Sequence, residues 1–255
     1  MLRELKKSFL LLSENKKKWL ICSLFDFLFL VLLIISASFF YNLFMRDYDY
    51  IGNTLENILV QDGQISGDLF SRLSGVSDTL INMLFIVLEF FLVAFLLWSL
   101  FQSVSWLISR NIVKRSKKFD LDYLLDFALF SLIWTLILGL IIYIFYNNSS
   151  LLQTFSIFIL NIPLLLFVYF GVISFALFSL SNKSLKSFKE CFLLGIKNPQ
   201  LLFPFLIFLL ILFFIGSLLS LVGLKLVNGF VFLLFLTWFR VYLLILVEKY
   251  VGDML

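Results

Sequence analysis

Six long apolar stretches constrain this sequence more than any other feature. Each reaches the ~18 to 20 residues that an α-helix needs to cross about 30 Å of hydrocarbon. The 62% hydrophobic content and the mean hydropathy of +1.07 are typical of a membrane protein. We therefore predict an all-α, polytopic membrane protein. Its six transmembrane helices are expected at about 19–45, 80–109, 124–146, 151–181, 201–224 and 229–248.

The basic residues predict the orientation of these helices. Of the 20 Lys and Arg residues, 16 fall in the N-terminal stretch, the second and fourth connectors and the C-terminus, and three fall on the opposite side. Cytoplasmic loops carry such an excess of Lys and Arg. Both termini are therefore predicted in the cytoplasm, for a multi-pass protein of the cell membrane. Basic residues at membrane edges also explain the net charge of +4 without nucleic acid as a partner.

Two short amphipathic segments, 2–12 and 184–195, each precede an apolar stretch. Their apolar residues recur every three to four positions among Lys and Arg, the pattern of a helix that lies in the membrane interface. We expect both on the cytoplasmic face, in contact with the lipid bilayer and its anionic headgroups. Shifted by 183 residues, Phe9-Leu10-Leu11 aligns with Phe192-Leu193-Leu194. This alignment suggests three repeated units, each a surface helix followed by a transmembrane hairpin.

The longest connector, 46–79, is predicted to be an extracytoplasmic loop. It is acidic, and glycines such as Gly52 and Gly75 argue against one long helix there. We expect two short amphipathic helices broken near Asp62-Gly63, or a β-hairpin turning at the same dipeptide. Asp78 is a candidate N-cap for the second transmembrane helix. With so little chain outside the membrane, residues 1–255 are expected to form a single membrane domain.

Three ionised side chains fall deep inside the predicted transmembrane helices, far from either end: Asp26, Glu89 and Arg240. A charge at the centre of such a helix costs about 2.5 to 3.5 kcal/mol on insertion, so at least one ion pair is expected. Estimated depths slightly favour Glu89 over Asp26 as the partner of Arg240. The remaining carboxylate could serve as a proton or cation site, or the pair could simply orient helices.

Other residues of the transmembrane stretches are better explained by packing or bending. Asn161 and Pro163 mark a candidate kink in the fourth helix, because proline removes a backbone hydrogen bond. Trp238 and Tyr242 flank Arg240, and either ring could contact its guanidinium.

No catalytic or metal-binding motif accompanies the helices. The chain has no His, two Cys and no nucleophile-elbow or phosphate-binding-loop motif, so neither an enzyme, a metal site nor a cofactor is expected. We predict a non-enzymatic membrane scaffold or accessory component. The alternative is a small transporter or channel that uses Glu89, Asp26 and Arg240. A third hypothesis is an insertase-like protein with a groove around Arg240.

The amphipathic entries into the first and fifth helices carry a family resemblance. The stretches Ser8-Phe9 to Lys16-Lys17 and Ser187-Phe188 to Asn198-Pro199 each lead directly into an apolar run. They resemble a broad group of uncharacterised six-helix prokaryotic membrane proteins, similar to the membrane domain attached to some glycerophosphodiester phosphodiesterases. The resemblance implies the six-helix topology. It implies no activity, because the catalytic barrel of those phosphodiesterases is absent from this sequence.

Overall fold

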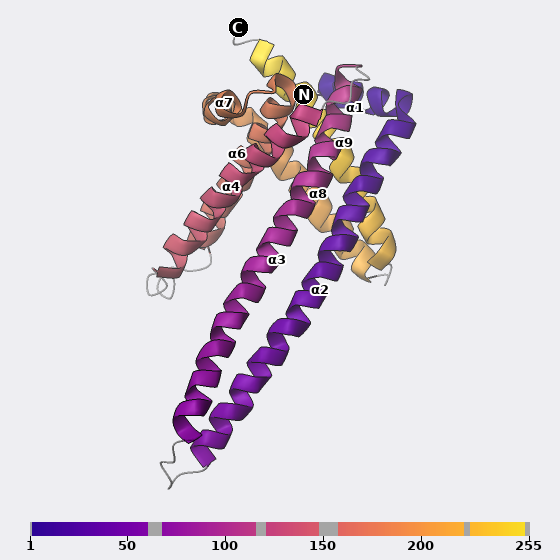
Figure 1. The fold of residues 1–255 in the computed structure, drawn as a ribbon. Coiled ribbons are helices and arrows are strands. Elements are labelled where there is room, and N and C mark those ends of the chain that lie inside the picture. Colours follow the sequence, from indigo (N-terminus) through magenta and orange to yellow (C-terminus); the bar gives the residue numbers. More distant parts are fainter. Residues whose placement is uncertain (1, 61–67, 116–120, 148–157, 222–224, 253–255) are drawn as a thin grey trace. The chain divides into compact units, whose positions relative to one another are not determined.

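The computed structural model describes residues 2–60, 68–115, 121–147, 158–221 and 225–252. These residues are almost entirely helical, and no strand occurs among them, as the all-α prediction expected. The helices are α1 (Leu2–Glu14), α2 (Lys16–Val60), α3 (Asp68–Val113), α4 (Leu121–Asn147), α6 (Phe158–Ser181), α7 (Ser184–Lys197), the short 3₁₀ helix η1 (Pro199–Leu201), α8 (Leu202–Leu221) and α9 (Lys225–Gly252) (Figure 1).

Five of the described helices are long and apolar enough to cross a membrane. They lie within α2, α3, α4, α6 and α9. A sixth is reached if α7 and the following Pro199–Ile211 segment, which meet at a bend of 93°, count as one broken span. The chain is therefore a multi-pass helical protein by length and composition. The count of six and the three repeated units stay predictions.

The prediction for the 46–79 connector was wrong in its boundaries. The helix of the first apolar stretch does not end at residue 45 but continues to Val60, and α3 already begins at Asp68. Gly52 and Gly75 lie inside these helices, and Asp78 is an internal, exposed residue of α3 rather than an N-cap. The predicted break at Asp62-Gly63 falls outside the described residues.

The contacts of the chain divide into two compact units. Unit 1 comprises Met1–Phe27 and Ser99–Leu255, and unit 2 comprises Leu28–Trp98. The described part of unit 2 consists of the C-terminal part of α2 and the N-terminal part of α3, which pair through Phe40 and Phe90, 5.8 Å apart at their ring centroids. The Tyr50 hydroxyl lies 3.3 Å from where a Cβ at Gly75 would be, so this glycine gives the tyrosine room. The single-domain prediction stays a prediction.

Among the candidate membrane-spanning helices of unit 1, α9 is the most buried. Of its most apolar stretch, 67% is buried, compared with 50% for α6 and 22% for α4. It packs most extensively against α1, α6 and α8. A stack of aromatic rings joins α4 to α6, in which Phe130 and Phe178 lie 5.0 Å apart. A second apolar cluster joins α1, α3 and α9 through Leu11, Leu12, Ile112, Val241 and Ile245. Packing on several sides therefore holds α9 and the polar residues it carries.

Candidate functional site

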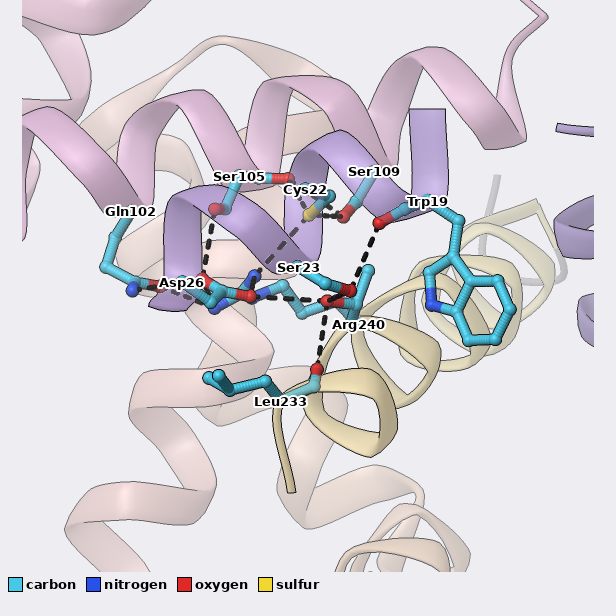
Figure 2. Close-up of polar contacts among 10 residues, drawn as sticks. Trp19, Cys22, Ser23, Asp26, Gln102, Ser105, Ser109, Leu233 and Arg240 are labelled. Atoms are coloured by element: carbon cyan, nitrogen blue, oxygen red, sulfur yellow. Dashed lines mark hydrogen bonds and ion pairs between the residues drawn. The ribbon is translucent and has the colours of Figure 1, made fainter. Parts of the chain in front are cut away.

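A buried ion pair between Asp26 and Arg240 is the centre of the candidate site (Figure 2). Arg240 Nη1 donates to Asp26 Oδ2 at 2.7 Å, and Nη2 donates to Oδ1 at 3.0 Å. This two-pronged arrangement matches the planar guanidinium to the carboxylate. The side chains are only 5% and 1% exposed. Both residues belong to unit 1, and the pair joins α2 to α9.

Other polar side chains complete the surroundings of the Asp26 carboxylate. Gln102 Nε2 donates to Oδ1 at 3.3 Å and Ser105 Oγ donates to the same atom at 3.0 Å, both from α3. Thr237 Oγ1, one turn before Arg240, lies 3.3 Å from Oδ2. The Gln102 carbonyl oxygen also accepts from Arg240 Nη2, so this one amide contacts both members of the ion pair.

The rest of the Arg240 guanidinium is covered by sulfur and by an aromatic ring. Nη1 lies 3.8 Å from the sulfur of Cys22, a free buried thiol that itself donates to the Ser105 carbonyl at 3.4 Å. The guanidinium carbon lies 5.7 Å from the centroid of Trp106, within range of a cation–π contact. The expectation that Trp238 or Tyr242 supplies the ring was wrong. Those two rings stack on each other at 5.7 Å.

Helical spacing explains how the sequence brings these groups together. Residues three and four apart share a helix face. Cys22 and Asp26 form one such pair on α2, Thr237 and Arg240 form another on α9, and Gln102, Ser105 and Ser109 line α3. Sequence reasoning found the two charges but missed Gln102, Ser105 and Thr237. The recurrence of polar residues at this spacing inside otherwise apolar helices was the signal that could have found them.

The cluster supplies hydrogen-bond partners to an ion pair whose arginine lies near the middle of a candidate membrane-spanning helix, where burying a charge has a high free-energy cost. At about 1.5 Å per residue, Arg240 lies roughly 14 Å and 16 Å from the two ends of the Val231–Val251 stretch. Burying such a pair is tolerable only when good geometry and additional hydrogen bonds offset the lost hydration. Here no side-chain nitrogen or oxygen of Asp26, Gln102 or Arg240 is both buried and without a partner. The cluster is suited to joining helices.

Glu89 takes no part in this cluster. It belongs to unit 2, where its side chain is exposed, and it has no hydrogen-bond or ion-pair partner among the described residues. The slight preference for Glu89 as the partner of Arg240 was therefore wrong. The depth estimate behind it assumed that the second helix begins at residue 80, whereas α3 begins at Asp68.

The remaining candidate residues lie elsewhere. Pro163 lies inside α6, and the kink predicted for Asn161 and Pro163 stays a prediction. Within the part of the chain that the structure describes, no three His, Cys, Asp or Glu residues are grouped to hold a metal ion. Cys191 is a free buried thiol, like Cys22.

Comparison with known proteins gives no relative from which a role could be transferred. No family model matches the chain, and neither curated proteins nor solved structures give a match. The resemblance to membrane domains attached to glycerophosphodiester phosphodiesterases therefore stays a prediction.

Proposed function

We propose that this chain is a non-enzymatic integral protein of the cell membrane that acts as a scaffold or accessory component. In this proposal the Asp26–Arg240 cluster is a structural clasp that joins α2, α3 and α9. The observation that carries the proposal is the enclosure of the cluster: a mid-helix charge pair, at most 5% exposed, to which side chains of α3 supply further hydrogen bonds. A transport site must instead open to water or to a substrate.

The membrane orientation follows from the distribution of charge. With both termini cytoplasmic, α1 and α7 lie at the cytoplasmic interface and contact anionic headgroups. The amphipathic sequence of α1 supports this placement, as does the 93° bend between α7 and the segment that follows it. Exposed Leu185 and Ile196 on α7 supply apolar surface for lipid.

The native thiol of Cys22 offers a direct test, because it is buried in contact with Arg240 of the clasp. In a Cys191→Ser background, Cys22 is the only thiol of the chain. Membrane-impermeant maleimides, applied to both sides of opened membrane vesicles, are expected to leave Cys22 unmodified, since no water reaches it. The matched control moves the single thiol to an exposed position of α1: Cys22→Ser removes the buried thiol, and Ser13→Cys introduces an exposed one. This thiol should react readily with the maleimides. Rapid labelling of Cys22 in folded protein would show a wet pathway and contradict the scaffold proposal.

A small transporter or channel is the second candidate. The observation that favours it is Glu89, an exposed carboxylate among exposed apolar neighbours such as Phe85, Leu88 and Leu92. A proton path through Glu89 predicts proton flux into proteoliposomes that Glu89→Gln abolishes. Equal flux in wild type, Glu89→Gln and protein-free liposomes removes this candidate. The insertase hypothesis needs an open groove at Arg240, and a guanidinium enclosed by Asp26, Gln102 and Trp106 does not support one.

A further inference from the structure

A charged cavity lies where the N-terminal helix α1 meets the last turns of α9. Its volume is about 630 Å³. This is within the range of ~300 to 1,000 Å³ that is typical of small-molecule sites. The residues that line it are Arg3, Glu4, Lys7, Ile245, Glu248 and Lys249.

Packing of α1 onto α9 fixes the walls of this cavity. Trp238 Nε1 donates to Ser8 Oγ at 3.2 Å, and the ring of Phe9 stacks on Trp238 with centroids 5.2 Å apart. Ile245, which lines the cavity, is 3% exposed and belongs to the apolar cluster that joins α1, α3 and α9. The cavity is therefore part of the folded contact between α1 and α9.

The charges around the cavity are of both signs. Glu4 and Lys249 pair across it, with Lys249 Nζ 2.9 Å from Glu4 Oε1. Arg3 and Lys7, one turn apart on α1, are exposed and have no ion-pair partner among the described residues. The same holds for the carboxylate of Glu248 on α9. Outside the Glu4–Lys249 pair, the cavity thus offers two cations on one wall and one carboxylate on the other.

We propose that this cavity binds the headgroup of a zwitterionic phospholipid that carries a primary amine. The phosphate lies against Arg3 and Lys7, since guanidinium and ammonium groups form charge-assisted hydrogen bonds to phosphate oxygens. The headgroup ammonium donates to Glu248. A quaternary choline has no N–H to donate there, and a headgroup that is only anionic leaves Glu248 facing a like charge. The inference rests on the proposed membrane placement, which puts this end of α1 and α9 at the cytoplasmic interface.

Native mass spectrometry of the purified full chain, released from detergent micelles, tests the preference. Phosphatidylethanolamine, phosphatidylcholine and phosphatidylglycerol with identical acyl chains compete at equal concentration. We expect phosphatidylethanolamine to bind about tenfold more than phosphatidylcholine, the scale of one charge-assisted hydrogen bond. Glu248→Gln should bring phosphatidylethanolamine down to the level of phosphatidylcholine. Arg3→Gln with Lys7→Gln should lower the binding of all three lipids.

Lys6→Gln is the matched control, because Lys6 is an exposed cation of α1 that does not line the cavity. It should leave the preference unchanged, and circular dichroism checks that every variant is folded. Equal binding of the three lipids, or a preference for phosphatidylglycerol that survives Glu248→Gln, overturns the proposal. Displacement of lipid by millimolar free phosphoethanolamine would assign the cavity to a soluble ligand instead. If the three lipids bind equally to a wild-type protein that resists carbonate extraction from membranes and protects Cys22 from maleimide, this inference is refuted and the proposed function stands.

Discussion

Each unit of the molecule contains an Arg–Asp pair, and the two pairs differ mainly in the burial of the arginine. In unit 1, Arg240 and Asp26 are 5% and 1% exposed and approach to 2.7 Å. In unit 2, Arg46 and Asp47 approach to 3.2 Å, and Asp47 is only 9% exposed, but Arg46 is 70% exposed. Each aspartate also accepts from a side-chain amide of α3. Gln102 donates to Asp26, and Asn82 donates to Asp47.

The comparison shows how burial changes the energetic role of the same chemistry. Water solvates a guanidinium that is mostly exposed, such as that of Arg46, so an ion pair that uses it typically contributes about 0 to 1 kcal/mol. A buried pair contributes little relative to an apolar replacement, but removing one member strands the other charge away from water. We therefore expect unit 1 to depend strongly on its pair and unit 2 to depend weakly on its own.

Removing the guanidinium of Arg240 gives the largest expected effect. Arg240→Leu leaves the Asp26 carboxylate without its counter-charge and should lower the free energy of unfolding by about 3 to 5 kcal/mol. The matched change in unit 2, Arg46→Leu, should cost less than about 1 kcal/mol. Reversible unfolding in mixed SDS micelles, followed by far-UV circular dichroism, measures both. Similar costs for the two variants would break the comparison.

Replacing the side-chain amide that contacts each aspartate should give a smaller difference in stability between the two units. Gln102 contacts both members of its pair and is 3% exposed, whereas Asn82 is exposed. Gln102→Leu should cost about 1 to 3 kcal/mol, because it removes a buried donor and a buried acceptor from charged partners. Asn82→Leu should cost about 1 kcal/mol or less. Thermal unfolding of the two variants in one detergent checks the order, and a reversed order would contradict it.

The smallest expected effect is a difference in how the two ion pairs respond to ionic strength. Raising salt from about 0.1 M to about 1 M shortens the Debye length from about 10 Å to about 3 Å. The small cost of Arg46→Leu should then disappear, since that guanidinium is in contact with solvent. The cost of Arg240→Leu should persist, because a buried pair is screened much less. The measurement is the same unfolding experiment at the two salt concentrations. A cost of Arg240→Leu that falls with salt would show that ions reach the clasp.

The sequence predicted the helices well where hydrophobic length alone decides the structure. It predicted their ends poorly. Gly52 and Gly75 weaken a helix by roughly 1 kcal/mol each relative to Ala, yet both lie inside helices. Contacts between the paired helices outweigh that local cost, among them Tyr50 against Gly75 and Phe40 against Phe90. Such contacts link residues distant in sequence, so propensity along one segment does not reveal them.

The candidate site was predicted only in part for a related reason. The free-energy cost of placing a charge in hydrocarbon identified Asp26 and Arg240 as residues that need partners. Depth along a helix could not choose between Asp26 and Glu89, because pairing also requires that the two side chains face each other. Cys22 shares a helix face with Asp26, and Thr237 shares one with Arg240, so these polar residues indicate the direction in which each charged side chain points. The two directions can be matched once the polar face of α3 is recognised as the neighbour of both.

A double-mutant cycle on Asp26 and Arg240 tests the clasp most directly. Asp26→Asn keeps an acceptor for Gln102 and Ser105 but removes the charge, so the double variant Asp26→Asn with Arg240→Leu contains no stranded ion. We predict that the double variant recovers most of the stability lost in Arg240→Leu, with a coupling of about 2 to 3 kcal/mol between the two sites. Costs that add to within about 0.5 kcal/mol would show that the two residues act independently and would contradict the clasp.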